Sequence, residues 1–185
     1  RVRKDELMPK LMEAMASPSP PKLVGDAPFM DDVRTEFDLT QLPIPKYFPG
    51  DQGRYITSAV AVAEHEGKSN VSFHRMHLRD KRSFAIRLVP RHLYTMWKSA
   101  RSKGKDLPTA FAMGLCPPVL LAGAMSTDYA TDEMHIASSL KERTLGSPLE
   151  VAKLQSGITV PAQAEIVFEG RITSKMVDEG PFMDI

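Results

Sequence analysis

The chain is short of cysteine, and its opposite charges nearly cancel. Cys116 is the single cysteine of 185 residues, so no disulfide can form within the chain, and a reducing, cytoplasmic setting is expected. Cys116 stands beside Pro117 and Pro118 in an apolar stretch, which favours a buried thiol over a nucleophile. The formal net charge is +1 and basic residues form no long run, so nothing indicates a nucleic-acid partner.

Long unbroken apolar runs are also missing. The longest stretch without a charge, residues 107–127, is long enough for a membrane span but is broken by three prolines and two glycines. We therefore expect buried strands and turns there, and no membrane partner. The charged N-terminus is not followed by the apolar core of a signal peptide. Because the chain opens at Arg1 and stops at Ile185 without a tail, we expect a fragment of a larger, multi-domain protein.

The sequence does contain alternating helical and extended patterns. Apolar residues recur at helical spacing over residues 4–16, 92–103 and 132–143. Ser147, Pro148 and Glu150 have the order of a capping box, which predicts a further helix. Strands are predicted over residues 55–63, 71–78, 83–89 and 164–168. This mixture predicts an α+β domain with a barrel-like sheet.

Six short strings carry a more specific signal. They are PGDQGRYIT at 49–57, NVSFHRM at 70–76, RLVPRHL at 87–93, TDE at 131–133, VPAQAEIVFEG at 160–170 and EGPFMD at 179–184. Each string alone is weak. In this order and together, they resemble the central, cofactor-binding domain of the UbiD-type prenylated-flavin decarboxylases.

That resemblance implies a split β-barrel of the flavin-reductase kind with a few peripheral helices. Residues 1–47 would be the remnant of an N-terminal lobe and its linker, and residues 48–185 the flavin-binding domain. The implied reaction is reversible, non-oxidative decarboxylation of an aromatic or α,β-unsaturated carboxylic acid, with a phosphorylated anhydromevalonate of isoprenoid synthesis as the first specific guess. A flavin prenyltransferase would supply the prenylated FMN, and the whole enzyme would be a homo-oligomer. The isolated piece would bind flavin and metal with little turnover.

The resemblance also implies a set of cofactor-binding residues. They are Asn70, Ser72, Phe73, His74, Arg75, Arg87, Leu88, Val89, Arg91, His92 and Glu133. Of these, Asn70, His92 and Glu133 would bind a manganese or magnesium ion that joins the FMN phosphate to the protein, with a potassium ion nearby. An amide, an imidazole and a carboxylate suit such hard ions. The residues alone favour a turn role for Asn70 and a helix-start charge for Glu133.

Arg75, Glu179 and Asp184 form the implied catalytic set. Decarboxylation leaves a carbanion equivalent that must be protonated, and Asp184 is the predicted general acid. Arg75 would keep Glu179 ionised and fix the geometry of the network. Without the resemblance, Asp184 is a solvated acid near the chain end. In one regular strand Asn70 and Arg75 would point to opposite faces, so we expect a bulge or bend near Ser72.

Two other functions stay open at this point. One is a flavin-binding module without decarboxylase activity, for which Arg75, Glu179 and Asp184 would be dispensable. The other is a structural subunit that binds neither flavin nor metal. No functional role is predicted for His65, His77 or His135.

Overall fold

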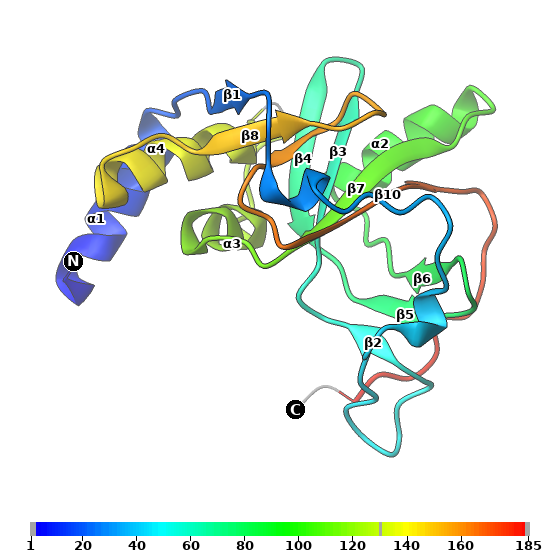
Figure 1. The fold of residues 1–185 in the computed structure, drawn as a ribbon. Coiled ribbons are helices and arrows are strands. Elements are labelled where there is room, and N and C mark those ends of the chain that lie inside the picture. Colours follow the sequence, from blue (N-terminus) through cyan, green and yellow to red (C-terminus); the bar gives the residue numbers. More distant parts are fainter. Residues whose placement is uncertain (1–2, 130, 184–185) are drawn as a thin grey trace.

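The computed structural model describes residues 3–129 and 131–183, in which four α-helices and ten strands occur. The strands form three sheets of three, four and three strands. The predicted α+β class is confirmed. Within this part of the chain the three sheets do not close into a barrel (Figure 1).

A four-stranded antiparallel sheet forms the centre of the fold. Its strands lie in the order β10 (Ile166–Ile172), β7 (Leu107–Met113), β3 (Val60–His65) and β4 (Lys68–Phe73). Residues 59–63 are apolar at every position and are buried throughout. A strand with this composition needs cover on both of its faces, and the helices provide it.

Three helices lie on one side of the central sheet. Val60 and Val62 pack with residues of α3 (Pro117–Ala124) and α4 (Glu133–Leu145) in one apolar cluster. Helix α1 (Lys4–Ala16) packs against α4 in turn, away from the sheet (Figure 1).

A single helix covers the other side. α2 (His92–Ser102), labelled in Figure 1, packs its buried residues against Ala61 and Phe111 of the sheet. The helices predicted over residues 4–16, 92–103 and 132–143 are therefore confirmed, with small shifts at their ends.

A second sheet joins the N-terminal region to the later part of the chain. β1 (Lys22–Val24) pairs in parallel with β8 (Glu150–Lys153), and β8 pairs antiparallel with β9 (Thr159–Pro161). The helix predicted from Ser147 is therefore wrong. Leu149, directly before β8, is 1% exposed. Strand β8 pairs with β1 on one side and β9 on the other, so its backbone amides and carbonyls find hydrogen-bond partners without a helix.

The third sheet lies below the central one in Figure 1. It contains β2 (Tyr55–Ile56), β5 (Met76–Leu78) and β6 (Phe84–Ile86), all antiparallel. The chain crosses between this sheet and the central sheet at residues 57–59 and again at residues 74–75.

These two crossings correct the strand predictions. The single strand predicted over residues 55–63 is wrong, as is the continuous strand over 71–78. The expected irregularity is present, but it lies at His74 and Arg75 rather than at Ser72. The backbone amide of His74 donates to the carbonyl of Ala59 at 3.2 Å, which joins the two crossings.

The apolar stretch 107–127 is only half extended. Residues 107–113 form β7 as expected, but Pro117 and Pro118 open a helix instead of a turn. The first amides of a helix have no intrahelical partner, so proline, which has no amide hydrogen, costs no hydrogen bond there. Cys116, directly before this helix, is half-buried. Across residues 3–129 and 131–183, no helix is long and apolar enough to cross a bilayer.

Candidate functional site

The start of α4 places a buried carboxylate against the middle of β4. Asp132 caps the helix by accepting a hydrogen bond from the Met134 amide at 2.8 Å. The next residue, Glu133, is only 2% exposed. Its Oε2 accepts from the Val71 amide at 3.1 Å, and its Oε1 accepts from the Thr127 hydroxyl at 2.8 Å. A carboxylate removed from water in this way needs such donors or a cation.

The other two predicted metal ligands lie at the same corner of the molecule. His92 begins α2, and its Nδ1 lies 3.5 Å from Glu133 Oε1. Asn70 is 3% exposed and directly precedes Val71, whose amide Glu133 holds. In the described ranges, no three His, Cys, Asp or Glu side chains gather as a metal site. The set here has two such side chains and an amide. Because Glu133 has no Lys or Arg ion pair among the described residues, this set fits a divalent cation.

A chain of hydrogen bonds holds residues 70–76, the segment predicted to contact the flavin. The Ser72 hydroxyl donates to Asn70 Oδ1 at 3.1 Å and lies 3.1 Å from His74 Nε2. His74 Nδ1 lies 3.1 Å from the carbonyl oxygen of Arg87. Burial lowers the pKa of His74, which favours a neutral ring. Strand β4 is thereby linked to the chain that follows β6.

The remaining predicted cofactor residues leave apolar and basic groups at the surface. Phe73 is 39% exposed and Val89 is 40% exposed. Leu88 is half-buried, and Arg87 and Arg91 are exposed. Exposed apolar side chains accompanied by arginines suit a ligand with an apolar ring and a phosphate. Arg91 directly precedes α2, and the N-terminus of a helix favours a phosphate.

Arg75 and Glu179 form a bidentate ion pair, although they lie 104 positions apart in the sequence. Arg75 Nε donates to Glu179 Oε1 at 2.5 Å, and Nη2 donates to Oε2 at 2.9 Å. The guanidinium carbon also lies 4.8 Å from the centre of the Phe182 ring. Two members of the predicted catalytic set are therefore in contact. The third, Asp184, lies outside the described residues.

The structure also points to two residues that received no predicted role. His77 is 4% exposed, and its ring stacks on that of Tyr55, with centroids 4.5 Å apart and planes 17° apart. Burial lowers the pKa of His77, and the nearby Glu179 backbone partly opposes this. The pairing of β2 with β5 places Tyr55 opposite His77 and so brings the two rings together. The strings at 49–57 and 70–76 do not specify the register of this pairing.

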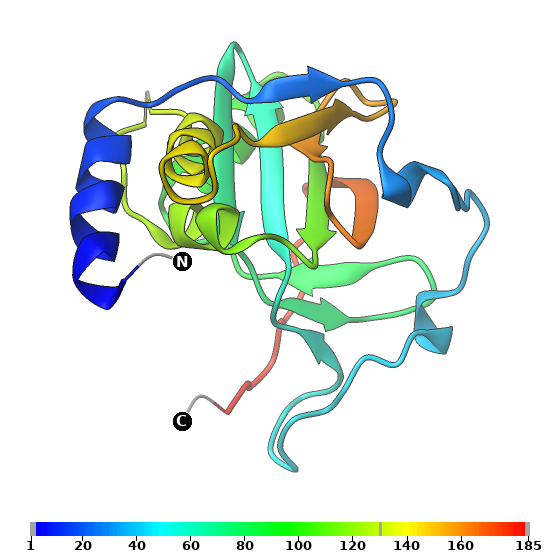
Figure 2. The same cartoon turned by 60° about the vertical axis from the view of Figure 1, so that its left-hand side comes forward.

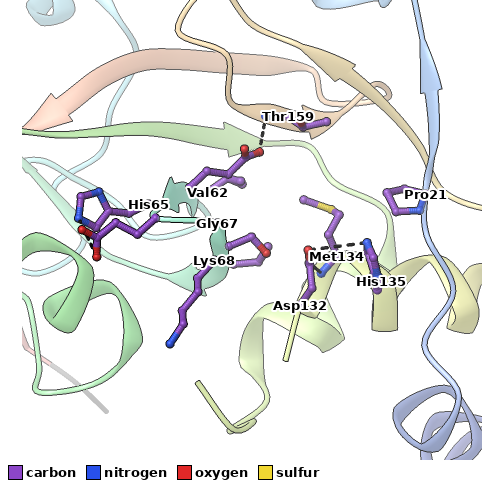
Figure 3. Close-up of a pocket in the computed structure, with 13 residues that line it drawn as sticks. Pro21, Val62, His65, Gly67, Lys68, Asp132, Met134, His135 and Thr159 are labelled. Atoms are coloured by element: carbon purple, nitrogen blue, oxygen red, sulfur yellow. Dashed lines mark hydrogen bonds and ion pairs between the residues drawn. The ribbon is translucent and has the colours of Figure 1, made fainter. Parts of the chain in front are cut away.

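A separate hollow of about 410 Å³ lies between the β3–β4 hairpin and the start of α4. Figure 3 shows His65, Lys68, Asp132 and His135 around it, with a dashed line to Thr159. Ser69 and Val71 line this hollow, and successive side chains of a strand point to opposite faces. Asn70 therefore points away from it, and the hollow is distinct from the predicted cofactor corner.

Fold and site together define an α+β structure with a buried carboxylate–imidazole contact and an arginine–glutamate pair. The family model described as UbiD, 3-octaprenyl-4-hydroxybenzoate carboxy-lyase Rift-related domain, matches residues 22–185. The chain belongs to this family.

Named relatives agree with this assignment. The chain is 40% identical over 186 residues to an anhydromevalonate phosphate decarboxylase of Methanosarcina mazei, covering 100% of this chain and 42% of the relative. It is 31% identical over 178 residues to a phenolic acid decarboxylase of Bacillus subtilis, covering 89% of this chain and 36% of the relative. The chain thus spans less than half the length of these relatives.

A solved structure shows the same fold. An evolved dimeric form of the UbiD-class enzyme HmfF from Pelotomaculum thermopropionicum, in complex with prFMN, superposes with a TM-score of 0.90. Its sequence is 38% identical, and the match covers 96% of this chain and 42% of that one.

Proposed function

We propose that the protein catalyses the reversible, non-oxidative decarboxylation of an aromatic or α,β-unsaturated carboxylic acid with prenylated FMN. The observation that carries the proposal is the Arg75–Glu179 pair, because it joins two members of the predicted catalytic set at hydrogen-bond distance. Support also comes from the solved HmfF structure, which contains prFMN, and from relatives named as decarboxylases. We regard the strands from β2 onward as parts of a split β-barrel domain that begins near residue 48, with β1 as an added edge strand paired to β8.

Residues on both sides of the β4–β5 crossing would hold the flavin. Phe73 and Val89 offer apolar surface for its ring, and Arg87, Arg91 and the start of α2 offer positive charge for its phosphate. When bound, the prenylated flavin supplies the electron sink that decarboxylation needs. Ser72 and His74 hold the backbone of this segment in place through their contacts with Asn70 and Arg87.

A manganese or magnesium ion would bind Asn70, His92 and Glu133, with a potassium ion nearby. The buried Glu133 carboxylate has two neutral hydrogen-bond donors and one imidazole as partners, so a cation would offset its charge. The ion would in turn hold the phosphate of the flavin.

Arg75 and Glu179 would orient the substrate carboxylate and the proton donor. Loss of carbon dioxide breaks a carbon–carbon bond and leaves the electron pair on the substrate carbon, which then takes up a proton. Glu179 paired to Arg75 is held as a hydrogen-bond acceptor with a fixed direction. Asp184, five positions further along, would donate the proton.

The first substrate to test is a phosphorylated anhydromevalonate, because the relative from Methanosarcina mazei is named for it and is 40% identical. An aromatic acid is the second, because the relative from Bacillus subtilis is named for phenolic acids. A flavin prenyltransferase would supply the cofactor, and the working enzyme would be a homo-oligomer, as the dimeric HmfF suggests.

The test uses the full-length protein co-expressed with a flavin prenyltransferase. The bound ligand is identified by its absorbance spectrum and mass, metals are measured in the same sample, and carbon dioxide release is followed with both acids. We expect prenylated FMN, about one manganese per chain, and release from one acid. A folded protein with ordinary flavin and no release from any acid would favour a flavin-binding module. A folded protein with neither flavin nor metal would favour a structural role.

A further inference from the structure

Two segments far apart in the sequence interlock beside the Arg75–Glu179 pair. They are residues 48–55, which lead into β2, and residues 178–183, which carry Glu179. Figures 1 and 2 both show the C-terminal segment running past β2. The backbone amide of Gln52 donates to the carbonyl of Pro181 at 2.8 Å.

The carboxylate of Asp51 accepts hydrogen bonds from both segments. It is 3% exposed, although its neighbour Gln52 is exposed. Its Oδ2 accepts from the Phe48 amide at 2.9 Å, which closes its own turn. Its Oδ1 accepts from the Met183 amide, also at 2.9 Å, which holds the opposite segment. The Met183 amide is the main cause of the lowered pKa of Asp51, so the carboxylate is ionised.

Tyr55 holds the main chain of Glu179 itself. The phenol is fully buried, and its hydroxyl donates to the Glu179 carbonyl at 2.9 Å. The ring is held between two others. It stacks on His77, and the Phe182 ring meets it edge-on at 4.8 Å. His77 fits closely against Gly53, because a Cβ at residue 53 would lie 2.5 Å from His77 Nε2.

We infer that Asp51, Tyr55 and His77 are positioning residues that hold segment 178–183 so that Glu179 meets Arg75. The inference rests on the proposed function, in which Glu179 acts beside the substrate. Tyr55 donates to the backbone carbonyl of Glu179, and Arg75 donates to its carboxylate, so both the main chain and the side chain of Glu179 are held. Asp51 fixes the same segment four positions later, at Met183.

The experiment compares Tyr55→Phe and Asp51→Asn with matched controls in the full-length, flavin-loaded enzyme. Tyr55→Phe removes one oxygen and keeps the ring between His77 and Phe182. Tyr94→Phe is its control, because Tyr94 packs on Trp97 in α2. Asp38→Asn is the control for Asp51→Asn, because Asp38 also caps a turn by accepting a backbone amide, that of Thr40 at 2.9 Å.

Two readouts are measured on each variant. Amide hydrogen exchange in segment 178–183 should become about fivefold to tenfold faster in Tyr55→Phe and Asp51→Asn and stay unchanged in the controls. In the same two variants kcat should fall about tenfold, with KM and bound flavin per chain unchanged. A purely structural defect would instead lower bound flavin or raise KM.

The outcomes separate this inference from the proposed function. Exchange in segment 178–183 equal to that of the wild type, or equal acceleration in the controls, overturns the positioning role. If the wild type releases no carbon dioxide, the proposed function fails, and the exchange rates still decide the positioning role. If Asp51→Asn does not fold, Tyr55→Phe decides.

Discussion

The carboxylate of Glu133, at the first position of α4, accepts a hydrogen bond from the main-chain amide of Val71 in the middle of β4. This bond joins the helix layer to the sheet next to Asn70. It also uses one lone pair of Oε2, and the remaining lone pairs of the carboxylate can bind a cation.

Glu133→Gln should weaken manganese binding by at least about tenfold. The amide oxygen can still accept from Val71, so the fold should be kept while the charge is lost. Metal content and a manganese titration of the purified protein measure the effect. Glu150→Gln is the control, because Glu150 is half-exposed and pairs with Lys22 on β1. Equal manganese affinity in both variants would remove Glu133 from the metal site.

Glu179→Gln should lower kcat by about a hundredfold or more while flavin content stays near that of the wild type. Glutamine keeps the size of the side chain but gives Arg75 a neutral partner. Steady-state decarboxylation and flavin absorbance measure the two quantities. Glu169→Gln is the control, because Glu169 is an exposed residue of β10 that accepts from the Ser156 amide. If kcat of Glu179→Gln matches that of this control, Glu179 is not part of the catalytic set.

Stability of the flavin-free protein should fall as the pH drops below about 6.5. Burial lowers the pKa of His74 in the folded state, so below the pKa of the unfolded histidine only the unfolded chain takes up the proton. Unfolding is then favoured, by at most about 1.4 kcal/mol per pH unit for one histidine. The pKa of His77 is lowered too, so its effect has the same sign.

Urea unfolding at several pH values, with His74→Gln and His135→Gln, checks this dependence. His74→Gln should flatten the acid side of the curve, and His135→Gln should leave it unchanged, because His135 has a 41% exposed side chain. An identical pH dependence in the wild type and His74→Gln would contradict the prediction.

Gly180→Ala should destabilise the protein more than Gly104→Ala does. Both glycines have positive φ, 79° and 68°, so alanine is strained at either position by about 1 kcal/mol. A Cβ at residue 180 would also lie 2.3 Å from Gln52 Cγ, whereas nothing lies within 4 Å of one at residue 104. Unfolding midpoints of the two variants test the difference, and equal midpoints would show that segment 178–183 is loosely held.

Local patterns predicted α1, α2 and α4 well because their signals lie within a few residues, whereas α3 was missed and the capping pattern at Ser147 precedes a strand. Helix α4, for example, has its capping Asp132 and its terminal Gly146, with φ of 79°, directly beside the apolar repeat. The family strings likewise predicted the meeting of Arg75 with Glu179. Residues 55–63, in contrast, form a continuous β-rich run, and only long-range pairing splits it between two sheets. The Tyr55–His77 contact depends on the same pairing and was missed for that reason.

The two crossings at residues 57–59 and 74–75 set the dimensions of the site. Asn70 and Glu133 belong to the central sheet and its helices, whereas Tyr55 belongs to the third sheet and holds the segment bearing Glu179. The separation between Asn70 and the Arg75–Glu179 pair therefore depends on the two short crossings, which the His74–Ala59 hydrogen bond joins. An insertion at residues 57–59 would change how the third sheet lies against the central sheet without replacing any residue of the predicted cofactor-binding or catalytic sets.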